Sequence, residues 1–191
     1  MRQEETSKGE EGGASSLLPL APSPATKRLL FWTTLVLTLI LDQWVKAWVR
    51  GNMRLDQSIA LWPNVFEIRY AKNTGIAFGQ LEGKGVLLTP IAIVIAIGAV
   101  VYIYRHPRES RWNHIAFGLL ASGALGNLYD RVVAKEVTDM FFFRLINFPI
   151  FNVADACITV ATIMLMIGWW RESATKTPPE PKLVENPGTP P

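Results

Sequence analysis

The sequence lacks most of the residue types that soluble enzymes use to build a metal or nucleophilic site. It has one cysteine and two histidines in 191 residues. A single cysteine excludes an intramolecular disulfide, and two separated histidines do not form a zinc constellation. No glycine-rich phosphate-binding motif is present in the sequence. We therefore expect neither a metal nor a cofactor.

Charged residues are also scarce, at 18% of the chain, and the net charge of +3 comes from dispersed residues, so we expect no nucleic-acid binding. Hydrophobic residues reach 49%, with seven tryptophans, which is unusual for a soluble domain of this length. The excess forms four stretches of 18 to 21 residues: Leu29–Val49, Val86–Tyr104, Trp112–Tyr129 and Val153–Trp170. As helices they would be roughly 27 to 32 Å long, and a bilayer core is about 30 Å thick. The pattern predicts an all-α membrane protein with four transmembrane helices.

Two other interpretations of these stretches fit less well. The helices of a soluble bundle would need polar faces at helical spacing, but Ile91–Val101 contains no charged residue. The first stretch follows Lys27 and Arg28, as the apolar core of a signal peptide would. No small-residue cleavage site comes after it, however, and the helical pattern continues past Asp42. We therefore interpret this stretch as a retained anchor.

The two ends of the chain have the composition of disordered tails. Residues 1–28 combine charged residues, Gly, Ser and Pro without apolar periodicity, and residues 172–191 are rich in Pro. The membrane domain is therefore expected at residues 29–171. The total numbers of Lys and Arg on the two sides nearly balance, but the three arginines within 105–111 favour the side that holds both termini as cytoplasmic. The two long loops would then face outward.

The first long loop, Gly51–Lys84, contains a strand pattern. Apolar and charged side chains alternate in Val65–Tyr70, a turn signal follows at residues 72–75, and a second apolar run occupies Ile76–Phe78. We expect a small β-sheet, a cradle at the membrane surface, in this first extracytoplasmic loop. A simple amphipathic plug without a catalytic part is the alternative.

Two groups of polar side chains recur at helical spacing near the outward ends of the predicted helices. Asp42 and Lys46 are four residues apart, so they share a helix face and can form a structural ion pair. Asn127, Asp130 and Arg131 present an amide, a carboxylate and a guanidinium on one face. Arg131 could act at a site or simply pair with Asp130. A run of small residues before this group predicts close helix packing.

Asp155 falls in the first turn of the last predicted helix, with Asn152 as its N-cap. A plain capping role therefore competes with a catalytic one. Spacing alone leaves open whether Asp130 or Asp139 accompanies Asp155 at a site. Asp139 precedes a Phe-rich segment, expected to be a loop, and no helix start explains a carboxylate there. Two carboxylates held close in apolar surroundings would share one proton and could hydrolyse a peptide bond through an activated water.

A cysteine nucleophile is the weaker alternative. The lone cysteine, Cys157, has no base nearby, because His106 and His114 lie toward the opposite membrane side. We expect Cys157 to be a small buried hydrophobic residue.

Five motifs, taken in order, resemble those of the lipoprotein signal peptidases, or signal peptidase II, the membrane aspartyl peptidases of bacteria. They are L-D-Q-W-V-K at 41–46, N-T-G-I-A-F at 73–78, G-A-L-G-N-L-Y-D-R at 123–131, V-T-D at 137–139 and F-N-V-A-D at 151–155. The resemblance extends from Leu29 to Trp170. It implies that Asp139 and Asp155 are the catalytic dyad and that Asn73 and Arg131 bind the substrate backbone. Residues implied to support the site are Asp42, Lys46, Gly75, Asn127, Asp130 and Asn152.

The same resemblance implies a substrate and a location. The substrate would be a prolipoprotein whose lipobox cysteine carries a diacylglyceryl group, cleaved just before that cysteine. The enzyme would be a monomer in the bacterial inner membrane, with both termini cytoplasmic and the site toward the outer leaflet. Membrane lipids and inhibitory globomycin-type cyclic peptides are the other expected partners.

The chain departs from the family pattern at Ser122, where Gly is common, and at Met140, where an aromatic residue is usual. Met140 follows the first dyad residue and bears on the shape of the site. A non-catalytic lipid-binding protein or a small transporter is the alternative function. Transport carboxylates lie mid-helix, however, whereas Asp139 and Asp155 are expected at the outward ends.

Overall fold

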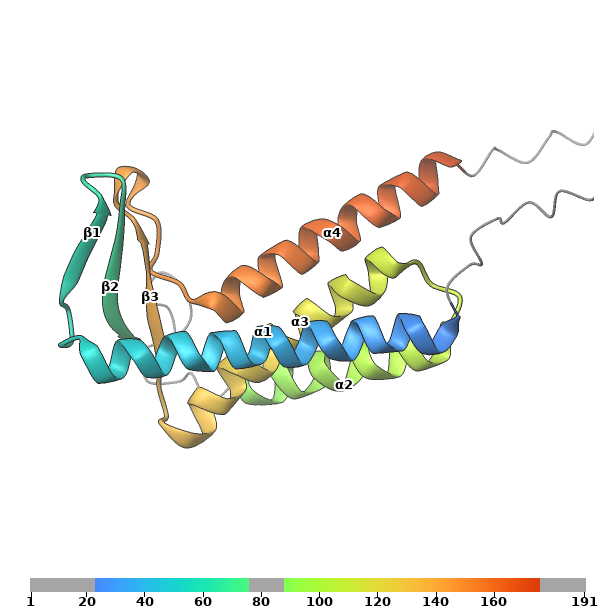
Figure 1. Ribbon diagram of the computed structural model, residues 1–191, viewed down its shortest axis with the longest axis horizontal. Coiled ribbons are helices and arrows are strands. Elements are labelled where there is room, and N and C mark those ends of the chain that lie inside the picture. Colours follow the sequence, from blue (N-terminus) through green and yellow to red (C-terminus); the bar gives the residue numbers. More distant parts are fainter. Residues whose placement is uncertain (1–22, 76–87, 176–191) are drawn as a thin grey trace, which may run out of the picture.

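The computed structural model describes residues 23–75 and 88–175, which form four α-helices and a three-stranded sheet. The helices lie together along the long axis of the molecule and the sheet lies across one end of them (Figure 1). The helices are α1 Pro24–Asn52, α2 Thr89–Arg105, α3 Arg111–Val133 and α4 Val153–Thr175. The strands are β1 Ser58–Trp62, β2 Phe66–Asn73 and β3 Val137–Phe143, and a 3-10 turn, η3, covers Arg144–Ile146.

All four predicted helices are present; α1, α3 and α4 extend beyond the apolar stretches, whereas α2 begins at Thr89 and ends one residue later than predicted. Helix α1 begins at Pro24 because Ser23 caps it, its Oγ accepting a hydrogen bond from the backbone N–H of Thr26 at 3.2 Å. Residues 24–28, which we expected in the tail, are therefore helical. Helix α4 likewise continues past Trp170 to Thr175. The rest of both predicted tails lies outside the described residues, as does Ile76–Phe78.

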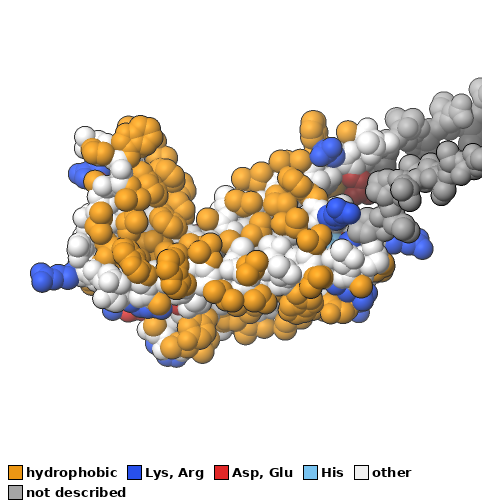
Figure 2. Space-filling model, in the orientation of Figure 1, with side chains coloured by type: hydrophobic (Ala, Val, Ile, Leu, Met, Phe, Trp, Pro, Cys, Tyr) orange, Lys and Arg blue, Asp and Glu red, His pale blue; other side chains and the backbone are white. Residues whose placement is uncertain are grey.

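Two of the helices, α1 and α4, are long and apolar enough to cross a membrane by length and composition. Helix α2 is a shorter apolar helix of 17 residues. Large apolar side chains are exposed around the helices, for example Val94 of α2 at 70% and Met166 of α4 at 63%. Hydrophobic side chains cover much of the visible face, and most Lys and Arg side chains in view lie toward the two ends (Figure 2). Such a surface suits a lipid environment.

Helix α3 packs closely against α1 and α4 through its small residues, as the sequence predicted. A Cβ added to Gly118 would lie 2.8 Å from the carbonyl oxygen of Phe31 in α1. A Cβ at Gly123 would collide with the carbonyl of Ala154 and lie 2.6 Å from the side chain of Ile158 in α4. The backbones can approach this closely only because these positions lack a side chain.

Gly123→Val is expected to destabilise the protein by about 2 kcal/mol or more, because the new side chain would force α4 away from α3. Gly98→Val is the matched control, since a Cβ at Gly98 of α2 has nothing within 4 Å. The measurement is thermal unfolding of both variants in detergent. Equal midpoints for the two variants would contradict the close packing.

The sheet has the order β1-β2-β3 and is antiparallel throughout. The predicted strand at 65–70 is confirmed as β2. The Phe-rich segment after Asp139 was wrongly expected to be a loop, since it forms β3, with Ala71 opposite Asp139 and Asn73 opposite Val137. Its sequence lacks the polar alternation of a half-exposed strand because Val137 through Met140 are buried on both faces. The second long loop therefore contributes one strand of the sheet.

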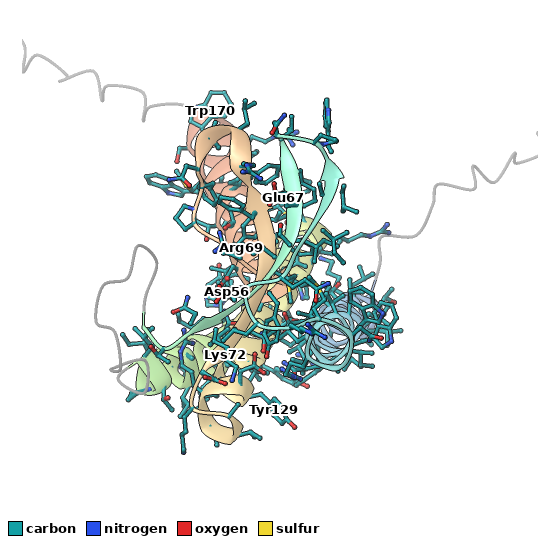
Figure 3. The ribbon with its side chains drawn as sticks, turned by 90° about the vertical axis from the view of Figure 1, so that its left-hand side faces the viewer. Asp56, Glu67, Arg69, Lys72, Tyr129 and Trp170 are labelled. Atoms are coloured by element: carbon teal, nitrogen blue, oxygen red, sulfur yellow. The ribbon has the colours of Figure 1, made fainter. Side chains whose placement is uncertain are left out.

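One face of the sheet packs on the end of α1. Tyr70 of β2 and Met140 of β3 form a buried cluster with Val49 and Met53. Along the sheet, Glu67 accepts hydrogen bonds from Ser58 and Arg144. Figure 3 looks onto this end of the molecule, with Glu67, Arg69 and Asp56 labelled along the sheet. Because Met140 of β3 packs on α1, this contact sets the position of the neighbouring Asp139 relative to the helices.

Candidate active site

Asp139 lies on β3, with its side chain 2% exposed. Its Oδ1 accepts a hydrogen bond from Asn152 Nδ2 at 2.6 Å, and its Oδ2 accepts one from Asn73 Nδ2 at 3.0 Å. The antiparallel register of β2 and β3 brings Asn73 within reach. The Asn73 amide is itself oriented by Gly75, whose backbone N–H donates to Asn73 Oδ1 at 3.0 Å. Gly75 therefore fixes which end of the Asn73 amide faces the carboxylate.

Asp155 lies in the first turn of α4 and forms a reciprocal cap with Asn152. The backbone N–H of Asp155 donates to Asn152 Oδ1 at 3.0 Å, and the backbone N–H of Asn152 donates to Asp155 Oδ2 at 3.2 Å. The predicted N-cap is therefore confirmed. Asp155 also accepts a hydrogen bond from Asn127 Nδ2 at 2.7 Å, so its carboxylate does more than cap the helix.

The two carboxylates meet at Asn152, which hydrogen-bonds both of them. Burial, followed by the nearby charge of Asp155, raises the pKa of Asp139 from its ordinary value of 3.8 to about 7. Asp139 is therefore partly protonated near pH 7, so one member of the pair can act as an acid while the other acts as a base.

A second layer of buried charge lies behind the carboxylates and is centred on Lys46. Its Nζ lies 2.9 Å from Asp42 Oδ2 and 3.0 Å from Asp130 Oδ2, which confirms the predicted pair with Asp42. Arg50 adds a longer contact to Asp130, at 3.8 Å. Asp42 also anchors α4, because its Oδ1 accepts the backbone N–H of Ala154 at 2.9 Å. The structure thus places Asp130 in this layer and Asp139 beside Asp155.

Arg131 points into a cavity of about 550 Å³ rather than pairing within 4 Å with Asp130, whose ion pairs in the described residues are with Lys46 and Arg50. The cavity lies between α4 and the linker at residues 148–151, where the surface is hollowed between sheet and helices (Figure 2). Asp155 and Asn73 line it, and Asp139 lies directly behind Asn73. Its apolar walls include Leu88, Phe148, Ile150 and Ile158.

Sequence reasoning missed two groups at the site. Arg50, which contacts Asp130 and donates to Thr138 Oγ1 at 3.1 Å, continues the i, i+4 series of Asp42 and Lys46 and could have been found by that spacing. The apolar linker at 148–151 carried no such signal. Met140 is fully buried against α1, on the opposite side of β3 from Asp139, so it affects the site through packing.

Residues 34–171 match the family described as "Signal peptidase (SPase) II". The chain belongs to the signal peptidase II family. It is therefore a hydrolase of an aspartic peptidase family. The matched segment includes both carboxylates, their three asparagine partners and the whole Lys46 layer.

Individual relatives agree with this assignment. The chain is 40% identical over 158 residues to a lipoprotein signal peptidase of Gloeobacter violaceus, covering 82% of this chain and 91% of that protein. It is 39% identical over 146 residues to the lipoprotein signal peptidase of Anoxybacillus flavithermus, covering 75% and 87%. A solved structure described as a bacterial membrane enzyme matches with a TM-score of 0.72 and 31% identity, covering 82% of this chain and 94% of that one. The chain is accordingly a bacterial membrane protein.

Proposed function

We propose that this enzyme removes signal peptides from prolipoproteins by hydrolysing the bond before the diacylglyceryl-modified cysteine, with Asp139 and Asp155 as its catalytic pair. The observation that carries the proposal is the shared hydrogen bonding of the buried Asp139 and the partly buried Asp155 to Asn152, at the wall of an apolar cavity. Family membership supplies the substrate class.

Hydrolysis needs one ionised and one protonated carboxylate. Asp155, at the N-terminus of α4, takes a proton from a water molecule, whose oxygen attacks the scissile carbonyl carbon. Asp139 holds the other proton and donates a hydrogen bond to the oxyanion that forms. When the C–N bond breaks, the departing amine takes up a proton from the pair, and the carboxyl product remains on the signal peptide. No covalent enzyme intermediate is required.

The cavity suits a lipid-anchored peptide. Arg131 and Asn73 offer donors to the peptide carbonyls on either side of the scissile bond, while the apolar walls accept the acyl chains or apolar residues of the signal peptide. The supporting residues Asp42, Lys46, Gly75, Asn127, Asp130 and Asn152 hold these groups in place. Globomycin-type cyclic peptides would compete for the same cavity.

The proposed orientation has all four helices crossing the bacterial inner membrane in a monomer. Both termini and the arginine-rich connection at 105–111 are then cytoplasmic. The sheet lies at the opposite end of the helices (Figure 1). Asp139 belongs to β3 of this sheet and Asp155 to the first turn of α4, so in this orientation both would lie toward the outer leaflet. A substrate anchored by its diacylglyceryl group would reach the cavity by lateral diffusion in that leaflet.

A gel-shift cleavage assay tests the proposal, using purified protein and a prolipoprotein with and without its diacylglyceryl group. We expect release of the signal peptide from the lipidated substrate only. Binding of the lipidated substrate without cleavage would favour a non-catalytic lipid-binding protein and would overturn the proposal.

The rate of cleavage is expected to fall above pH 7. Asp139 must be protonated to act as the acid, and its pKa is raised to about 7, so kcat should drop about tenfold for each further pH unit. The same shift makes folding less favourable as pH rises from 3.8 to about 7, because the folded state binds the proton more tightly than the unfolded state. The measurement is kcat at saturating substrate between pH 5 and 9. A constant kcat up to pH 9 would contradict this role of Asp139.

A further inference from the structure

Lys46 is fully buried near the end of α1, and its ion pairs and hydrogen bond within the described residues go to Asp42, Asp130 and Asn127 rather than to Asp139 or Asp155. Besides its two carboxylate partners, it has one neutral partner, Asn127, whose Oδ1 accepts a hydrogen bond from Lys46 Nζ at 3.0 Å. The ammonium group carries three N–H donors, and Asn127 accepts the third of them. The hydrogen bond from Lys46 to Asn127 connects the Lys46 layer to the catalytic carboxylates, because Asn127 also donates to Asp155.

The contact fixes the orientation of the Asn127 amide. An ammonium group can only donate, so the carbonyl end of the amide must face Lys46. The amide nitrogen then faces the other way, where it donates to Asp155 Oδ1 at 2.7 Å. Asn152 Nδ2 adds a second donor to Asn127 Oδ1 at 3.1 Å and also donates to Asp139. A flip of Asn127 would break all three of its hydrogen bonds.

We propose that Lys46 is a positioning residue of the catalytic pair, which acts through the amide of Asn127 to hold Asp155 in place and to favour one net negative charge on the two carboxylates. This inference rests on the proposed roles of Asp139 and Asp155. Lys46 itself contacts neither substrate nor reacting atoms.

The charged groups around the catalytic pair determine how the loss of Lys46 would affect the ionisation of the pair. From α1, the charged groups that face the layer are Asp42 and Arg50, and from α3 they are Asp130 and Arg131. The catalytic pair adds Asp139 from β3 and Asp155 from α4. Loss of Lys46 leaves two buried carboxylates facing the pair with only Arg50 and Arg131 to balance them. Each further ionisation of the pair then becomes less favourable.

The test is the pH profile of cleavage by Lys46→Gln, beside Arg50→Gln as the matched control. Arg50 is a cation of the same layer that contacts Asp130 but makes no contact with Asn127. We expect both limbs of the Lys46→Gln profile to move to higher pH by about one unit, with kcat reduced about 10- to 100-fold and KM within twofold. The Arg50→Gln profile should stay within about 0.3 unit of the wild-type profile. A purely structural role would lower the amount of active protein without moving the profile.

A second variant keeps the test decisive if Lys46→Gln does not fold. Asn127→Ala breaks the connection but leaves Lys46 paired with Asp42 and Asp130. It should lower kcat and move the profile in the same direction. Where Lys46→Gln does fold and Lys46 acts through Asn127, the double variant Lys46→Gln/Asn127→Ala should have a kcat within about threefold of Asn127→Ala alone. If the losses in kcat of the two single variants multiply in the double variant, the two residues act independently and the proposal is overturned. An Asn127→Ala pH profile that does not shift would also overturn it. A wild-type protein that does not cleave at all would instead refute the proposed function.

Discussion

Asp155→Asn is expected to reduce cleavage of the lipidated prolipoprotein by at least about 10³-fold while the protein remains folded. The substitution removes the base that activates water, and no other carboxylate can take its place, since Asp139 must supply the acid. Asp139→Asn should cause a loss of similar size for the complementary reason. Because the two carboxylates act as a unit, the double variant should be little worse than either single one.

Folding should survive these changes. The amide of asparagine has nearly the shape of the carboxylate, and its oxygen can still accept a hydrogen bond from the neighbouring asparagines, Asn127 and Asn152 at position 155 or Asn73 and Asn152 at position 139. Asp56→Asn is the matched control. Asp56 is 72% exposed, and its positive φ of 62° is one that asparagine tolerates well. The control should retain wild-type activity. A folded Asp155→Asn variant that cleaves at the wild-type rate would refute the two-carboxylate mechanism and make Cys157 the next residue to test.

Lys46→Met is expected to have the largest effect on stability, about 3 to 5 kcal/mol. Lys46 is the buried cation between Asp42 and Asp130, whose side chains are 1% and 2% exposed. Removing it leaves both carboxylates without their main partner in a setting of low polarity, where an uncompensated charge is costly. A loss of this size is a large fraction of the net stability of a typical domain, about 5 to 15 kcal/mol.

The matched control for this loss is Lys72→Met. Lys72 pairs with Glu136 at 2.6 Å, a shorter distance than either ion pair of Lys46, but the two side chains are 41% and 28% exposed. An exposed pair of this kind contributes about 1 kcal/mol or less. Unfolding of both variants by denaturant in detergent at pH 7 gives the comparison. Adding Asp130→Asn to Lys46→Met should restore part of the stability, because it removes one unpaired charge. Equal losses for the two single variants would show that burial is not what makes the Lys46 layer important.

The sequence by itself determined the helices, strand β2 and the local contacts. Apolar runs of bilayer length set the four helices, because each run is continuous along the chain and needs no knowledge of its neighbours. Spacing within one helix set the Asp42–Lys46 pair, and the residue type at position 152 set the cap of α4. Family resemblance named Asp139 and Asp155, which no local pattern had singled out together.

Tertiary structure decided which of these faces meet. Periodicity shows that Asn127, Asp130 and Arg131 share one side of α3, but not that Asp130 turns to Lys46 while Arg131 turns to the cavity. The pairing of β3 with β2, which converts an expected loop into a strand and brings Asn73 to Asp139, joins segments more than sixty residues apart. Local sequence cannot specify such a contact, because its free energy comes from packing and hydrogen bonding that exist only once both segments are in place. The polar groups were therefore visible in the sequence, and their assembly into one site was decided by the fold.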